Sequence, residues 1–306
     1  MNHPYSTDIY ANALSHWGEA FPVPEWGCHV IVRAVPGGAD AFGTYPIAVM
    51  ATDADLPGGL ERLRRAGLIA VTLVMDEFHR PGSAELRTHF NLVRPYKTHY
   101  IRRLSLPFSY GRHHRYEVAR ALRKVSVRQF DLADHYPEWL ALYGNLVQRH
   151  RLTGVHDFPA SHFAALQKLP GTASMGAWLD GALVSAHLWV GDGQKIHSHL
   201  AASSSEGYAS GAAYAVYDAS IRHFSGAELL NFGGGAGAGD DADDGLAAFK
   251  RGFSNASAPA YICGAILDKT KYDELVAHRA VAAHETYFPA YRTPAPEGAN
   301  DGRVSP

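Results

Sequence analysis

Two histidines and a lysine are the residues whose types and spacing most clearly suggest chemistry. His197 and His199 alternate within a predicted strand at 195–202, so both side chains should point to the same face. An imidazole there can accept a proton at neutral pH. Lys250 lies in a short predicted helix at 245–253, where a cation can stabilise developing negative charge or hold a phosphate. The sequence therefore indicates a polar site near the strand and this helix.

Each of these residues also has a structural interpretation. The histidines can simply pack under a helix, and Lys250 can be a surface lysine. A metal pair is possible at the spacing of His197 and His199, but no third ligand is evident nearby, so we predict no metal site. No convincing Ser-His-Asp or Cys-His arrangement appears in the chain.

A polar, glycine-containing loop follows the histidine strand and leads into a predicted helix at 209–224. Ser203, Ser204, Gly207 and Gly211 lie there. Backbone groups at such a strand-to-helix junction can bind a ligand, although the same residues can serve as a helix cap. We therefore expect either a ligand-binding loop or a capped helix start.

Further candidates lie on two predicted helices. Tyr214 and Asp218 are four residues apart and share a helix face, either as a structural pair or to orient a substrate. Arg112 and Arg115 lie in a basic helix at 110–124. From Arg87 to Arg128 the chain has eleven Lys or Arg residues and one acid. This segment is either a solvated surface or a surface for phosphates, including those of RNA.

A run of seven glycines and alanines at 233–239 follows a short predicted strand. It formally matches a dinucleotide-binding fingerprint, but four aspartates (Asp240, Asp241, Asp243 and Asp244) come where a helix should start and would repel a pyrophosphate. Gly233 and Gly234 more plausibly allow close backbone approach to a substrate, or form a flexible loop. The aspartates are either a solvated loop or ligands for Ca²⁺ or Mg²⁺.

Composition limits the class of protein. The chain has 306 residues and a formal net charge of −2, so it carries no overall nucleic-acid signature. No apolar run approaches the roughly 20 residues of a membrane span, and the first twenty residues do not read as a secretory signal. Cys28 and Cys263 are isolated, which fits neither a zinc site nor a disulfide framework. A cytoplasmic location is the simplest expectation.

The order of predicted elements indicates an α/β (α+β) protein in two parts. Strands at 28–35, 46–51 and 68–75, with a helix at 60–66, belong to the first part, residues 1–130. The second part, residues 131–288, has two helices, a three-strand antiparallel meander from 175 to 202, the helix at 209–224, a strand at 228–232, and a final strand at 260–267. Residues 289–306 are predicted to be a flexible tail.

This order is that of the GNAT acyltransferase fold, and the residues add a more specific resemblance. The run from Gly176 to Leu275 resembles the Fem-type (FemAB-like) aminoacyl and peptidyl transferases. The pieces that carry it are AWLDGALVSAHLWV, HLAAS, GAAYAVYDASI, LLNFGGG, GLAAFKRGF and a Tyr272-x-x-Leu275 pair. The resemblance implies a tandem GNAT-like fold with a mixed sheet, a degenerate first half and a better-formed second half.

The resemblance also implies an activity. It would be attack of an amine on an activated acyl ester or thioester, which needs a held carbonyl and stabilisation of the developing oxyanion. Phe249 and Lys250 match the Phe-Lys pair that the family places beside the donor ester. From the residues alone, either His197 or His199 could take the proton of the amine, and His199 is our candidate. Donor binding then falls to the loop residues and the glycine run, and acceptor binding to Tyr214, Asp218 and the two arginines.

The donor and acceptor are less defined. Acetyl-CoA enzymes of this fold carry an Arg/Gln-x-x-Gly-x-Gly/Ala loop, whereas this chain has Tyr208-Ala-Ser-Gly211-Ala-Ala213. Aminoacyl-tRNA is therefore the favoured donor, with acyl-CoA or an acyl carrier protein as the alternative. The acceptor would be a small-molecule or peptide amine, and no bound cofactor is expected. A non-catalytic binding protein on the same fold is the rival interpretation.

Overall fold

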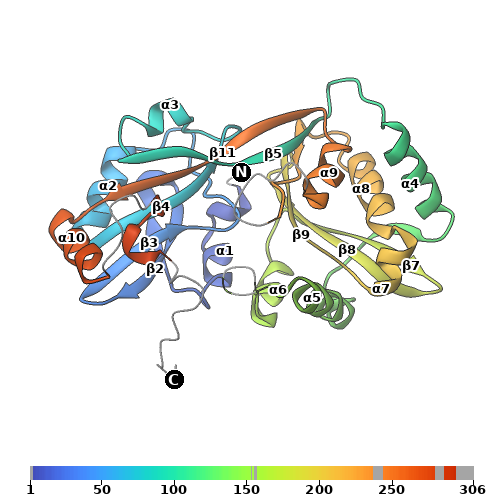
Figure 1. Cartoon of the computed structure of the whole chain (residues 1–306), viewed down its shortest axis with the longest axis horizontal. Helices are drawn as coiled ribbons and strands as arrows, with labels where there is room; N and C mark the ends of the chain where they lie inside the picture. Colours follow the sequence, from blue (N-terminus) through green and yellow to red (C-terminus); the bar gives the residue numbers. More distant parts are fainter. Residues whose placement is uncertain (1–2, 153, 155–156, 237–243, 280–285, 294–306) are drawn as a thin grey trace.

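The backbone is organised around one mixed β-sheet that runs through both parts of the chain (Figure 1). The computed structural model describes residues 3–152, 154, 157–236, 244–279 and 286–293. Within these residues the sheet has eleven strands, in the order β1-β2-β3-β4-β11-β5-β10-β9-β8-β7-β6. The strands are β1 (Glu19–Val23), β2 (Cys28–Val35), β3 (Gly38–Gly43), β4 (Leu68–Asp76), β5 (Leu92–Arg103), β6 (Ser126–Phe130), β7 (Thr172–Leu179), β8 (Ala182–Gly191), β9 (Lys195–Ser203), β10 (Leu229–Asn231) and β11 (Ala256–Ile266).

Helices cover both faces of this sheet. Short 3₁₀ turns lie at Pro4–Ser6 (η1), Pro24–Trp26 (η2) and Ala290–Arg292 (η4). The α-helices are α1 (Asp8–Ala13), α2 (Leu56–Arg65), α3 (Ser83–Leu86), α4 (Arg112–Leu122), α5 (Tyr136–His150), α6 (Ala160–Leu166), α7 (Ser205–Ser210), α8 (Ala212–His223), α9 (Gly245–Arg251) and α10 (Lys269–His278). Within the described residues, no helix has the length and apolar character needed to span a membrane.

Strand β11 joins the two parts of the chain. It lies between β4 and β5 and pairs antiparallel with both. In Figure 1, β5 and β11 run together across the top of the molecule, from the first half on the left to the second on the right. One sheet continues through both parts of the chain. The predicted domain boundary between residues 130 and 131 therefore stays a prediction.

The two faces of the second half have separate cores. Trp139 of α5, Phe163 of α6 and Leu188 of β8 pack on one face. Trp189, the next residue of β8, packs on the other face with Val216 of α8 and the residues of α4. Successive strand residues point to opposite faces, so neighbours such as Leu188 and Trp189 enter different cores, and register shifts between β7, β8 and β9 interrupt this alternation.

Several predicted elements need correction. Residues 46–51 are not a strand. They form an extended connection in which Ala48 N–H donates to Val74 O (2.8 Å). Their apolar side chains are buried, as in a strand, which explains why the sequence predicts one there. The strands β1 and β3 were not predicted. The helix expected at 209–224 is confirmed as α8, which starts after Gly211. The residues before it, expected to be a loop, form a separate helix, α7, which ends where Gly211 adopts a left-handed conformation (φ 73°).

The last described segment is held against the first half. Arg292 donates to the buried carboxylate of Asp40 on β3, with Nη2 to Oδ1 at 2.9 Å, and the Tyr291 hydroxyl donates to the same carboxylate at 3.1 Å. Tyr291 packs with Tyr272 of α10. Ordered structure therefore extends to Thr293 in the segment predicted to be a flexible tail. Residues 294–306 lie outside the described residues.

We predict that Arg292→Met lowers the free energy of unfolding by about 2–4 kcal/mol. Among the described residues, it leaves the fully buried Asp40 carboxylate with the more distant Arg33 guanidinium as its one charged partner. Denaturant titration measures this loss. The matched control is Lys269→Met, which removes an exposed i,i+4 pair with Asp273 and should cost less than about 1 kcal/mol. Equal effects of the two substitutions would show that the Asp40 contact does not anchor the segment.

Candidate active site

The candidate site lies where β10 stops pairing with β9. The two strands are parallel and pair over Leu229–Asn231, while β9 continues to Ser203. After Asn231 the chain follows β5 instead: Phe232 N–H donates to Tyr100 O (2.9 Å), and Tyr100 N–H donates to Gly233 O (3.1 Å). The glycine run therefore begins at the point where two parallel strands part, which is a place where backbone groups are free to meet a ligand.

Lys250 is directed at this point. Its Cα lies on α9, its side chain is 9% exposed, and its Nζ donates to the carbonyl oxygen of Gly234 at 2.6 Å. Gly233 has a left-handed backbone (φ 72°), and a Cβ there would lie 3.6 Å from Lys250 Nζ. The lysine predicted to act on a donor thus contacts the glycine run predicted to bind it.

The surroundings of Lys250 lower its pKa to a value close to neutral pH. Burial and, to a smaller extent, the nearby ammonium group of Lys97 together lower the pKa of Lys250 to about 7, against the opposing effect of the Asp244 carboxylate. Lys97, on β5, donates to the carbonyl oxygen of Gly235 at 3.2 Å. A lysine with this pKa can both give and take up a proton at physiological pH.

Asp244 fixes the position of α9 relative to the glycine run. It is the N-cap of α9, and its carboxylate accepts from the N–H groups of Leu246 (3.0 Å), Ala247 (3.3 Å) and Ala236. The other three aspartates of the acidic loop lie outside the described residues. Asp244 therefore has a structural role as a cap, and the possibility of a metal loop at all four aspartates stays untested.

An aromatic layer lies beside Lys250 on the same face of the sheet. The ring of Phe249 packs edge-on against Tyr214 and Tyr217 of α8, with centroids 4.8 Å apart in each case. His114 of α4 donates from Nε2 to the carbonyl oxygen of Phe249 (2.9 Å). The Tyr214 hydroxyl hydrogen-bonds to His113 (3.2 Å). The structure thus brings Tyr214 and Phe249 together, as expected if both belong to one site.

His187 of β8 is a member of this group that the sequence did not indicate. It is buried, its Nε2 is 2.7 Å from the Ser198 hydroxyl, and its ring packs on Tyr217 (4.7 Å). Burial lowers the pKa of His187 well below its usual value, and the charge of Lys250 acts in the same direction. His187 is therefore a neutral imidazole within electrostatic reach of Lys250.

His199 lies on the opposite face of β9 from Lys250. The alternation prediction is confirmed, since His197 and His199 both contact the ring of Tyr5. The Tyr5 hydroxyl hydrogen-bonds to His199 Nδ1 (3.0 Å), and His162 Nε2 is 3.4 Å from His199 Nε2. Burial lowers the pKa of His199 well below its usual value. The structure does not bring His199 and Lys250 into one contact group.

The loop after β9 has a well-defined structural role. Ser204 caps α7 by accepting from Gly207 N–H (3.1 Å), and Ser203 hydrogen-bonds to Ser185 (2.9 Å). A Cβ at Gly207 would lie 2.1 Å from Val184 O, so only glycine fits against β8. Gly211 separates α7 from α8, at the end of α8 that carries Tyr214. A donor-binding role for these four residues stays a prediction.

The remaining predicted residues face α4 or solvent. Asp218 accepts from the Tyr110 hydroxyl (2.8 Å) and pairs with Arg222, so its carboxylate is already occupied. Arg112 and Arg115 are exposed in the first turns of α4. The structure therefore places the arginines on a helix next to the aromatic layer, where they are accessible to a large ligand.

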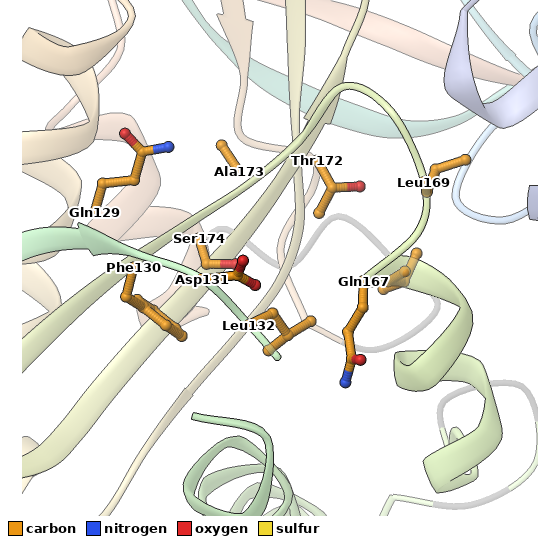
Figure 2. Close-up of a pocket in the computed structure, with 10 residues that line it drawn as sticks. Gln129, Phe130, Asp131, Leu132, Gln167, Leu169, Thr172, Ala173 and Ser174 are labelled. Carbon is orange, nitrogen blue, oxygen red and sulfur yellow. The ribbon is translucent and has the colours of Figure 1, made fainter. Parts of the chain in front are cut away.

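A separate cavity of about 440 Å³ lies at the far edge of the second half, between the β6–α5 and α6–β7 connections. Figure 2 shows Phe130 and Leu132 along one wall, with Gln167 at the other. The only carboxylate that lines it, Asp131, accepts from Ala133 N–H (2.8 Å) as a turn residue. The cavity shares no lining residue with the Lys250 site.

Comparisons of the whole chain with known proteins give similarity in structure alone. No protein-family model matches the sequence, and no curated protein matches it. Among solved structures, FemX matches with a TM-score of 0.64 and 14% identity over 89% of this chain and 95% of FemX.

Two further structures match over similar lengths. The C-terminal domain (DUF2156) of a putative lysylphosphatidylglycerol synthetase from Agrobacterium fabrum gives a TM-score of 0.61 and 14% identity, over 92% of this chain and 94% of that one. L-PGS from Bacillus licheniformis gives 0.57 and 13%, over 91% and 97%. The predicted α/β, GNAT-like fold and the resemblance to the Fem-type transferases are therefore confirmed at the level of the fold.

Proposed function

We propose that this protein is an N-acyltransferase that moves an aminoacyl group from aminoacyl-tRNA to the amine of a small-molecule or peptide acceptor. The observation that carries the proposal is Lys250, a buried lysine with a pKa near 7 whose Nζ is directed at the glycine run where β9 and β10 part. The shared fold with FemX and the lysylphosphatidylglycerol synthetase domains supports the same class of reaction.

In this proposal the donor ester binds beside Lys250 at the glycine run, and the Lys250 ammonium group exchanges its hydrogen bond to Gly234 O for one to the ester. The acceptor nitrogen attacks the ester carbonyl carbon, a C–N bond forms, and the carbonyl oxygen becomes an oxyanion. The ammonium form of Lys250 donates a hydrogen bond to that oxygen and then its proton to the departing ester oxygen as the C–O bond breaks. Neutral Lys250 takes the proton lost by the acceptor nitrogen, which restores the starting state.

The choice of aminoacyl-tRNA as donor is supported by the position of the basic helix. Arg112 and Arg115 are exposed on α4. Between them in the sequence, His113 and His114 of the same helix contact Tyr214 of the aromatic layer. A nucleic acid whose acylated end reaches Lys250 would pass close to this helix. Acyl-CoA or an acyl carrier protein is the alternative donor and would depend on the α7–α8 junction at Gly211 instead.

The donor is tested by binding the purified protein to total charged tRNA over a salt series, with uncharged tRNA and acyl-CoA as competitors. We expect a preference for charged tRNA and an affinity that falls steeply with salt. Saturable binding of acyl-CoA with no preference for charged tRNA would reject the RNA donor and favour the thioester alternative.

Replacing both Arg112 and Arg115 with alanine should weaken tRNA binding about tenfold or more at low salt. It should also lower the number of counterions released on binding by about two, as measured by the slope of log K against log salt, because each guanidinium is expected to contact one phosphate. The salt series above measures both quantities. Arg64→Ala with Arg65→Ala, on exposed positions of α2 in the first half, is the matched control and should change neither. An unchanged slope in the α4 variant would remove this helix from the donor site.

Lys250→Met should reduce the turnover number at least about 100-fold, with a smaller change in KM, because the variant loses the oxyanion contact and the proton carrier but no exposed surface. Transfer from the charged tRNA selected by the binding assay to a panel of small amines gives the rate. Lys250→Arg keeps a cation but cannot exchange a proton near neutral pH, so it should stay well below wild type. Undiminished turnover in a folded Lys250→Met protein would instead favour the non-catalytic alternative.

The pH dependence of turnover should move when Lys97 is replaced. In the wild-type protein, turnover should fall as pH rises through about 7, because Lys250 loses the proton needed in the ammonium form. Lys97→Met removes a positive charge that disfavours the protonated form, so the pKa of Lys250 rises and the fall shifts to higher pH. A pH profile that does not move would show that Lys250 does not set this limb.

A further inference from the structure

Three histidines from distant parts of the sequence meet on the face of β9 opposite Lys250. His3 precedes η1, His79 follows β4, and His197 lies within β9. Among the described residues they form a group in which one ring nitrogen of each lies within 4.8 Å of the other two. All three side chains are at least nine-tenths buried. The chain fold therefore gathers three imidazoles at one buried point.

One ring nitrogen of each of these histidines has no hydrogen-bond partner in the part of the chain that the structure describes. The Nε2 atoms of His3, His79 and His197 are each buried without a hydrogen-bond partner among these residues. A buried polar atom without a partner is costly, and three of them at one point are unusual. A shared ligand that accepts three nitrogen lone pairs would satisfy all of them together.

His79 is already oriented for such a ligand. Its Nδ1 lies 2.9 Å from Oδ1 of Asp76, so Nδ1 carries the proton and Nε2 presents its lone pair. Asp76 is itself fixed, because its Oδ1 also accepts from the N–H groups of Phe78 and His79 (3.1 Å each). A carboxylate that orients a histidine in this way is the usual outer partner of a metal-bound imidazole.

His3 needs one adjustment to act as a ligand. Its Nδ1 accepts from Tyr5 N–H at 3.2 Å, which places the imidazole proton on Nε2. Binding through Nε2 moves that proton to Nδ1 and breaks this long hydrogen bond. The rings of His3 and His79 are edge to face with centroids 5.2 Å apart, and those of His3 and His197 are edge to face with centroids 5.4 Å apart.

We propose that His3, His79 and His197 bind a divalent transition metal ion, and specifically Zn²⁺, through one ring nitrogen each. Imidazole ligands suit zinc, and bonds of about 2.0–2.1 Å in a tetrahedral site would separate the three nitrogens by about 3.4 Å. This is a contraction from the separations of up to 4.8 Å in the ion-free group. Three neutral histidines leave a fourth position for water or another ligand, while Asp76 offsets part of the added charge.

The proposed ion would link three segments that are far apart in the chain: the start of the described residues, the end of β4 in the first half, and β9 in the second. Asp76 extends the link, since Asn231 Nδ2 lies 3.4 Å from its Oδ2 and Asn231 Oδ1 accepts from Gly233 N–H (2.8 Å). The ion would thus support the strand end that precedes the glycine run. The inference does not depend on the proposed acyl transfer.

The test is metal binding by the full chain after removal of metal with a chelator. Titration with Co²⁺, which substitutes for Zn²⁺ and is coloured, should show one equivalent bound with the intense visible bands of a tetrahedral site. Competition with Zn²⁺ should remove the bands, and Zn²⁺ alone should raise Tm. His79→Gln and His197→Phe should each weaken binding about 100-fold or more. Asp76→Asn should weaken it about 10- to 100-fold through the loss of orientation.

The control is His162→Gln, which changes another buried histidine on the same face of the sheet that is not a member of the group. It should bind Co²⁺ with wild-type stoichiometry and spectrum. Circular dichroism of each ion-free variant identifies any that fail to fold, and His3→Ala, near the chain start, provides a ligand variant outside the sheet. Wild-type protein that binds no Co²⁺, or that binds it equally well in the His3, His79 and His197 variants, would overturn the proposal.

Discussion

The structure depends on the point at which β10 leaves the sheet, and Asn231 holds that point. Its backbone pairs in parallel with His197 of β9 and antiparallel with Ile101 of β5. Its buried side chain contacts Asp76 and His99 on one side and caps the turn at Gly233 on the other. Because β10 is so short, the chain departs from β9 directly into the glycine run, and Lys250 meets it there.

This arrangement separates two kinds of chemistry on the two faces of one strand. Ser198 of β9 points toward His187 and Tyr217, whereas His197 and His199 point toward His3, Tyr5 and Tyr10 near the start of the chain. On one face lies the buried side chain of Lys250. On the other face lie the buried imidazoles of His3, His79, His197 and His199, and the carboxylates of Asp76 and Asp192 act on His3. The separation follows from strand alternation alone.

The sequence alone predicts part of the candidate site. Lys250 is indicated by the resemblance of Phe249 and Lys250 to the Phe-Lys pair of the Fem-type family, and the shared face of His197 and His199 follows from their spacing. His187 was missed because it lies in an apolar strand, and its contact with Ser198 depends on a register shift between β8 and β9. Strands β1 and β3 were missed because EAFPV and GADAFG contain proline, glycine and alanine, which disfavour strands in isolation. The partners of His197 could not be found at all, since His3 and His79 meet it only through tertiary packing.

The central claim is that Lys250 is a buried lysine that exchanges its proton near neutral pH. The most direct measurement is an NMR titration of protein labelled with ¹³C in its lysine side chains, with the resonance of Lys250 identified by its loss in Lys250→Met. The account predicts one lysine resonance that titrates near pH 7, far below the ordinary value of about 10.4. A Lys250 resonance that titrates near the ordinary value would contradict it, because the side chain would then be a solvated permanent cation rather than a group able to exchange a proton during acyl transfer.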